Sequence, residues 1–110
     1  MSKSANIYFR HMLNEIIFLT EHSVSITEDQ FMRDEVLQRS FARSLEIIGE
    51  AAKHVDEGTR LANPSIDWKS LAGLRDKLIH HYFGVDYAIV WDVIKNELPQ
   101  VGEELNKIIV

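Results

Sequence analysis

Hydrophobic residues recur every three or four positions along almost the whole chain, and the strict alternation typical of half-buried strands is missing. Such spacing places the apolar side chains on one face of an α-helix. Glycine and proline, the residues that most often interrupt helices, are confined to a few positions. The sequence therefore predicts an all-α fold.

The first half of the chain carries two long apolar stripes separated by a short segment. One helix is expected over residues 4–22, and a second helical stretch begins after Thr27, which forms a capping-box pattern with Gln30. A long helix follows from about Asp34, and Gly58 supplies a C-terminal stop for it. The stripe of this helix consists of Leu37, Phe41, Leu45, Ile48, Ala52 and Val55.

The second half of the chain is expected to hold one loop and two helices. Residues 57–65 form the loop, Asp67 caps a helix that ends around Gly84, and Asp86 caps the final helix. Pro99 predicts a kink in the final helix just before it, because proline lacks a backbone donor. The stripe of the helix after Asp67 consists of Leu71, Leu74, Leu78 and Tyr82. Together the stripes favour an antiparallel bundle of four to five helices.

Three further positions bear on packing. Gly49 lies inside a predicted helix, where glycine costs about 1 kcal/mol relative to alanine, and this indicates that another helix approaches closely. Trp68 and Trp91 lie on or beside apolar stripes, so we expect them to be buried. A polar face of the long helix is expected to carry solvated ion pairs, with RNA or partner contacts as the alternative. It consists of Arg39, Arg43, Glu46, Glu50, Lys53 and Glu57.

Composition narrows the class of protein. The chain has 110 residues, 45% of them hydrophobic, which is enough for one compact domain over residues 1–110. Seventeen Asp and Glu against twelve Lys and Arg give a net charge of −5, which argues against a broadly basic surface for nucleic acid. We expect no DNA partner, and any contact with RNA would need a local basic patch.

Cysteine is absent, which excludes disulfides, thiolate zinc sites and a cysteine nucleophile. This composition suits a reducing compartment, so we expect the protein in the cytoplasm. The apolar runs are too short to span a membrane, and the N-terminus lacks the features of a signal peptide, so no membrane partner is expected.

The richest local chemistry lies in residues 75–82, which read RDKLIHHY. On an ideal helix Arg75 falls beside the apolar stripe and about 20° from Tyr82, whereas His80 falls about 140° from Arg75. Asp76 and His80 are four residues apart and share a face, so the carboxylate can orient the imidazole. One continuous helix therefore forms two separate pairs, Arg75 with Tyr82 and Asp76 with His80. All four side chains come together only if the helix ends near His80 or if a second copy of the chain contributes.

A purely structural role is the alternative that these residues leave open. Arg75 can pack its aliphatic stem on the core, Asp76 and Lys77 can be surface charges, and Tyr82 can be buried. A histidine at position 80 or 81 can then simply end the helix favourably.

The spacing of Arg75, four residues, His80, one residue and Tyr82 resembles the Arg-x4-His-x-Tyr signature of HEPN-domain ribonucleases. The wider sequence resembles the HepT-like toxin branch of that family, through residues 45–53 (LEIIGEAAK) and 80–86 (HHYFGVD). The resemblance covers nearly the whole chain.

The resemblance implies a dimeric helical bundle and a metal-independent endoribonuclease whose site lies between two protomers. In that site His80 would act as general acid or base and Arg75 would bind the scissile phosphate. Asp76 would orient a neighbouring group. Tyr82 would lie near the phosphate and accept AMP from a minimal nucleotidyltransferase antitoxin.

The expected partners follow from the same resemblance: RNA, with tRNA as the candidate, the nucleotidyltransferase antitoxin, and a second copy of the chain. No metal or other cofactor is expected, since His11, His22 and His54 lack ligand spacing. The alternative function is a non-catalytic helical module that binds a nucleotidyltransferase and a nucleotide or substrate. A purely structural helical dimer is a third possibility.

Overall fold

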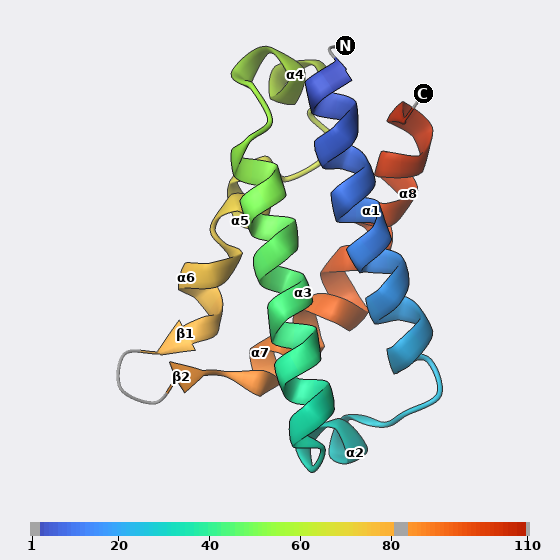
Figure 1. The fold of residues 1–110 in the computed structure, drawn as a ribbon, viewed down its shortest axis with the longest axis vertical. Coiled ribbons are helices and arrows are strands. Elements are labelled where there is room, and N and C mark those ends of the chain that lie inside the picture. The colour runs from blue at the N-terminus through green and yellow to red at the C-terminus, as the bar shows by residue number, and fades with distance from the viewer. Residues whose placement is uncertain (1–2, 81–83, 110) are drawn as a thin grey trace.

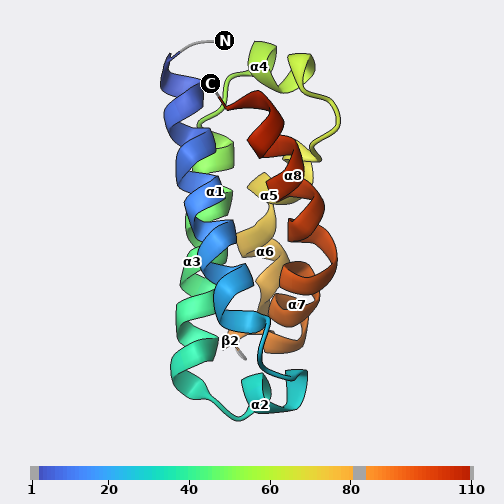
Figure 2. The same cartoon turned by 90° about the vertical axis from the view of Figure 1, so that its right-hand side faces the viewer.

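A computed structural model describes residues 3–80 and 84–109 of the chain. The two longest helices, α1 (Lys3–Ser23) and α3 (Glu35–Lys53), lie side by side along the molecule (Figure 1). A second layer packs against them and contains the shorter helices of the C-terminal half (Figure 2). The predicted all-α bundle is confirmed.

The remaining elements are short. In chain order, α2 (Glu28–Met32) comes between the two long helices, and α4 (Glu57–Ala62), α5 (Trp68–Ala72) and α6 (Leu74–Leu78) follow them. Two-residue strands β1 (Ile79–His80) and β2 (Gly84–Val85) pair antiparallel, with Ile79 opposite Val85 and His80 opposite Gly84. The chain then continues through α7 (Tyr87–Asp92), a π-helical segment η2 (Val93–Glu97) and α8 (Leu98–Ile108). In the described part of the chain, no helix has the length and apolar character needed to cross a membrane.

The predicted helix starts are confirmed by side-chain caps. Thr27 and Gln30 form a complete capping box, in which each backbone N–H donates to the other's side chain, at 2.9 and 3.1 Å. Asp34, Asp67 and Asp86 each accept hydrogen bonds from backbone N–H groups two or three residues later. These bonds satisfy donors that a helix N-terminus otherwise leaves unpaired.

The predicted loop over residues 57–65 and the stop at Gly58 are wrong. The long helix ends at Lys53, and Gly58 lies inside α4. Asp56 begins this helix: its carboxylate accepts hydrogen bonds from the Thr59 hydroxyl at 2.6 Å and the Thr59 N–H at 3.0 Å. Because α4 contains no buried residue, no apolar stripe marks it in the sequence.

The cap of α4 leads to a pH prediction. The hydrogen bonds from the Thr59 side chain, and then from its backbone, lower the pKa of Asp56 below its ordinary value. A carboxyl group whose pKa is depressed in the fold stabilises α4 above its unfolded pKa, and this contribution disappears as the pH falls through the folded pKa. In an NMR titration, Thr59→Val should raise the pKa of Asp56, whereas Thr59→Ser should leave it low. An unchanged value in Thr59→Val would contradict this account of the cap.

The predicted helix from Asp67 to Gly84 is also wrong, because it is broken twice. It pauses at Gly73 between α5 and α6, and it ends at Leu78. Ile79 adopts an extended conformation, and the Asp86 N–H donates to the Leu78 carbonyl at 2.7 Å. Gly84 has a φ of +74°, which glycine adopts without the steric cost that a Cβ imposes. Tyr82, the last member of the predicted stripe, lies outside the described residues.

Close packing around Gly49 confirms the expected approach of another helix. A Cβ at position 49 would lie 3.1 Å from the Leu71 carbonyl oxygen, so α5 packs tightly against α3. The tryptophans differ: Trp68 is buried and stacks on Phe9, whereas Trp91 is only half-buried beside Phe31. Both rings still belong to, or pack against, the main hydrophobic core.

The irregularity predicted near Pro99 takes the form of a π-helical segment. Pro99 lies in the first turn of α8, directly after η2, and the Leu98 N–H donates to the Val93 carbonyl five residues earlier. Proline cannot donate to the ladder, and the hydrogen-bond pattern shifts by one residue just before it. The helix is therefore interrupted where the sequence predicted, through a local change of helix type.

Candidate functional site

Arg75 and Asp76 lie in the first turn of α6, and both side chains are exposed. The helix is held against the core by Leu74 and Leu78, which are almost fully buried. Within the described residues, neither Arg75 nor Asp76 forms a side-chain hydrogen bond or ion pair. Arg75 directly follows the buried Leu74 but is itself exposed, so a position beside the apolar stripe does not keep its side chain out of water.

The expected shared helix face of Asp76 and His80 is wrong, whereas contact between their side chains stays a prediction. The helix ends at Leu78, so His80 belongs to β1, where its backbone pairs with Gly84. Of the four candidate site residues, Arg75 and Asp76 thus lie on a helix and His80 lies on a strand. Tyr82 and its neighbour His81 lie outside the described residues.

A shallow depression of about 470 Å³ surrounds the first turn of α6. It is lined by Lys53, Arg75, Asp76 and Ile79, which come from the end of α3, from α6 and from β1. Gly49 makes this arrangement possible, because it lets the α5 backbone approach α3 closely. Two cationic side chains beside one carboxylate form a site suited to an oxyanion such as a phosphate group.

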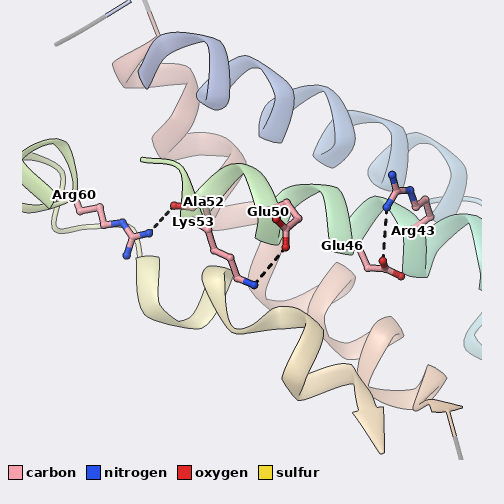
Figure 3. A network of polar contacts seen from close by, with 6 residues as sticks. All are labelled: Arg43, Glu46, Glu50, Ala52, Lys53 and Arg60. Atoms are coloured by element: carbon pink, nitrogen blue, oxygen red, sulfur yellow. Dashed lines mark hydrogen bonds and ion pairs between the residues drawn. The ribbon is translucent and has the colours of Figure 1, made fainter. Parts of the chain in front are cut away.

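The exposed face of α3 carries the expected ion pairs. Arg43 pairs with Glu46 at 3.7 Å and Lys53 with Glu50 at 3.4 Å, as Figure 3 shows. Arg39 pairs with Glu35 at 2.6 Å one turn from the start of the helix. The interpretation of this polar series as a solvated face laced with ion pairs is confirmed for these pairs.

Lys53 is the residue near the signature that spacing alone did not single out. The sequence places it on a polar helix face, 22 positions before Arg75, and only the folded chain brings both to one depression. A second cation of the signature segment, Lys77, makes an ion pair with Glu97 at 2.8 Å and so ties α6 to η2. Lys77 is therefore engaged in packing the segment, whereas Lys53 and Arg75 face the depression.

His11, His22 and His54, which lack the spacing of metal ligands, pack their rings against aromatic side chains. His54 stacks on Tyr8 with centroids 5.2 Å apart, and His11 meets the same tyrosine edge-on at 6.3 Å. His22 packs against Phe18. Among residues 3–80 and 84–109, no cluster of three or more His, Asp or Glu side chains could hold a metal ion.

Comparison with known proteins places the chain in a family. Residues 12–108 match the family described as ribonuclease HepT-like. The chain is 44% identical to a protein of Caldanaerobacter subterraneus subsp. tengcongensis named as an RNase, over 97% of this chain and 96% of the relative. It is 34% identical to a protein of Thermococcus cleftensis named as a ribonuclease HepT, over 98% of both.

A third relative combines two activities in its name. It is a protein of Methanocaldococcus jannaschii named as a gamma-glutamylcyclotransferase and RNase; it is 41% identical over 98% of this chain but 49% of its own length. No solved structure matches the chain. The family match and the two full-length relatives lead to one conclusion: the chain belongs to the HepT-like ribonuclease family.

Proposed function

We propose that this protein is a metal-independent endoribonuclease of the toxin type, with RNA as its substrate and tRNA as the first candidate. The observation that carries the proposal is the exposed guanidinium of Arg75 in a cationic depression next to the strand that contains His80. Membership of the HepT-like ribonuclease family, and relatives named as RNases, support the same chemistry.

His80 serves as the proton-transfer group. An imidazole takes the proton from a ribose 2′-hydroxyl, and the 2′-oxygen then attacks the adjacent phosphorus. A bond from phosphorus to the 2′-oxygen forms while the bond to the 5′-oxygen breaks. The leaving 5′-oxygen receives a proton, so the products are a 2′,3′-cyclic phosphate and a free 5′-hydroxyl.

Arg75 stabilises the negative charge that grows on the phosphate oxygens in this step. A guanidinium presents parallel N–H donors in a planar fork that matches two phosphate oxygens, and its charge is permanent. Exposure and the lack of a side-chain partner in the described residues leave the fork of Arg75 available. Asp76, on the next position of α6, orients a neighbouring group of the site.

The active form is a homodimer in this proposal. The depression is shallow and lined by few residues, so one protomer leaves a bound RNA strand largely in water. Developing charge is stabilised better when water is excluded. A second copy that closes the cleft supplies that enclosure and brings a second set of Arg75 and His80.

Inactivation by a nucleotidyltransferase antitoxin completes the proposal. The antitoxin transfers AMP from ATP to the hydroxyl of Tyr82. The modified residue belongs to the same eight-residue segment as Arg75 and His80, so the added phosphate enters the RNA site.

Cleavage of RNA in the presence of a chelator tests the proposed function. The wild type should cleave total RNA in EDTA and leave 2′,3′-cyclic phosphate ends, whereas His80→Ala should be about 10²–10⁴-fold slower, since it lacks the proton-transfer group. His22→Ala is the matched control, because it removes an exposed histidine at the end of α1. Equal rates for all three proteins would sink the ribonuclease proposal, and would favour the non-catalytic interaction module. If EDTA stopped cleavage by the wild type, the proposal of metal independence would be rejected and the ribonuclease proposal would remain.

A further inference from the structure

Lys53 is the second cation of the depression that contains Arg75, and its side chain is only loosely engaged. Among the residues that the structure describes, its ion-pair partner is Glu50, at 3.4 Å on the same helix face. The two side chains are 49% and 57% exposed, so water screens the attraction between them. Exposed pairs of this kind contribute little to stability, so a phosphate can displace Glu50 at little cost.

Arg60, and not Lys53, caps the C-terminal end of α3. Cations near a helix C-terminus often bind its last carbonyls and interact with the helix dipole. At the end of α3 this role belongs to Arg60, which donates to the Ala52 carbonyl at 2.7 Å (Figure 3). Arg60 also donates to the Val55 carbonyl, at 3.0 Å. The ammonium of Lys53 is therefore not needed to cap α3 and can bind a ligand in the depression.

We propose that Lys53 is a second phosphate-binding residue of the site, which holds a non-reacting phosphate of the RNA strand beside the scissile one bound by Arg75. The proposal rests on the proposed ribonuclease function for its substrate. It fits the side chains: a flexible ammonium suits a phosphate that only needs a point charge, whereas the rigid fork of Arg75 suits the phosphate that reacts. It also gives a chain with a net charge of −5 a place where two cations line one depression, with Asp76 beside them.

The chain contains a matched control for this residue. Lys107 lies in the last turn of α8 and pairs with Glu104, three residues earlier, at 3.3 Å. Lys53 has the same relation to Glu50 at the end of α3. Replacing either lysine by glutamine removes one charge from an ion pair of the same spacing near a helix end, but of the two lysines only Lys53 lines the depression.

Binding of a fluorescently labelled single-stranded RNA tests the proposal, with every variant built on His80→Ala so that the probe stays intact. Lys53→Gln should weaken binding about fivefold and reduce the slope of log K against log salt by about 0.7, as expected when one phosphate contact to a single strand is lost. Lys107→Gln should change neither quantity, and Lys53→Arg should restore both. In proteins with an intact His80, Lys53→Gln should raise KM and leave kcat within about twofold, because the contact is equal in ground and transition states.

The outcomes separate this inference from the proposed function. If the wild type cleaves RNA and Lys53→Gln binds it with the affinity and salt slope of Lys107→Gln, the role of Lys53 is refuted and the ribonuclease stands. If the wild type binds RNA through Lys53 without cleaving it, the catalytic proposal fails and the phosphate site remains. A wild type that neither binds nor cleaves RNA refutes both. Thermal unfolding of each variant shows that the fold is intact.

Discussion

Arg75→Ala is expected to slow RNA cleavage about 10²–10³-fold, the range seen when one donor to a developing oxyanion is removed. The loss should fall on kcat, because the guanidinium acts on charge that exists only in the transition state. Stability should be unaffected, since the side chain is exposed and has no side-chain partner among the described residues. The measurements are cleavage kinetics on a labelled RNA and a thermal unfolding curve.

Two variants sharpen this test. Arg75→Lys keeps the charge but loses the planar fork, so it should recover only part of the activity. Arg33→Ala removes another exposed arginine, which pairs with Asp29 at 3.3 Å next to α2, and it should cleave at the wild-type rate. Wild-type kcat in Arg75→Ala would exclude Arg75 from the reaction, whatever the effect on binding.

Transfer of AMP to Tyr82 is expected to abolish cleavage. The tyrosine oxygen attacks the α-phosphorus of ATP, a new oxygen–phosphorus bond forms, and pyrophosphate leaves. The product carries a negative phosphate and a nucleoside where the RNA phosphate must bind. The added charge repels the RNA, and the added nucleoside blocks its entry to the site. Incubating the protein with a nucleotidyltransferase antitoxin and ATP should add the mass of whole AMP units and stop RNA cleavage in parallel.

The tyrosines of the chain supply the controls. Tyr82→Phe should gain no mass, whereas Tyr87→Phe, which changes a half-buried tyrosine at the start of α7, should be modified like the wild type. No gain of mass on the wild type, or a gain that survives in Tyr82→Phe, would reject Tyr82 as the acceptor. A modified protein that still cleaves RNA would reject the blocking mechanism.

Helix starts could be predicted from this sequence, because they depend on interactions within three residues. Thr27 with Gln30, Asp34, Asp67 and Asp86 all cap helices through side-chain oxygens, and each is visible as a local pattern. Helix ends were harder. The end at Leu78 depends on a hydrogen bond from the Asp86 N–H across the hairpin, which no local pattern encodes.

The candidate site could be predicted in part for the same reason. The spacing from Arg75 to Tyr82 is local, and it identified the segment without a structure. The nearness of Lys53 to Arg75 depends on where α3 ends and on the close approach of α5 at Gly49. A helical projection also put His80 on one face with Asp76, which holds only for a helix that continues past Leu78.

The hydrogen bond between Leu78 and Asp86 has a consequence for how firmly α6 is held. The Asp86 N–H donates to the Leu78 carbonyl at 2.7 Å, and this bond joins the end of α6 to the residue that caps α7. The short helix that carries Arg75 is thus fixed at its C-terminal end by this bond and along its length by the buried Leu74 and Leu78. A guanidinium on a helix held in this way has its backbone position set before any ligand arrives.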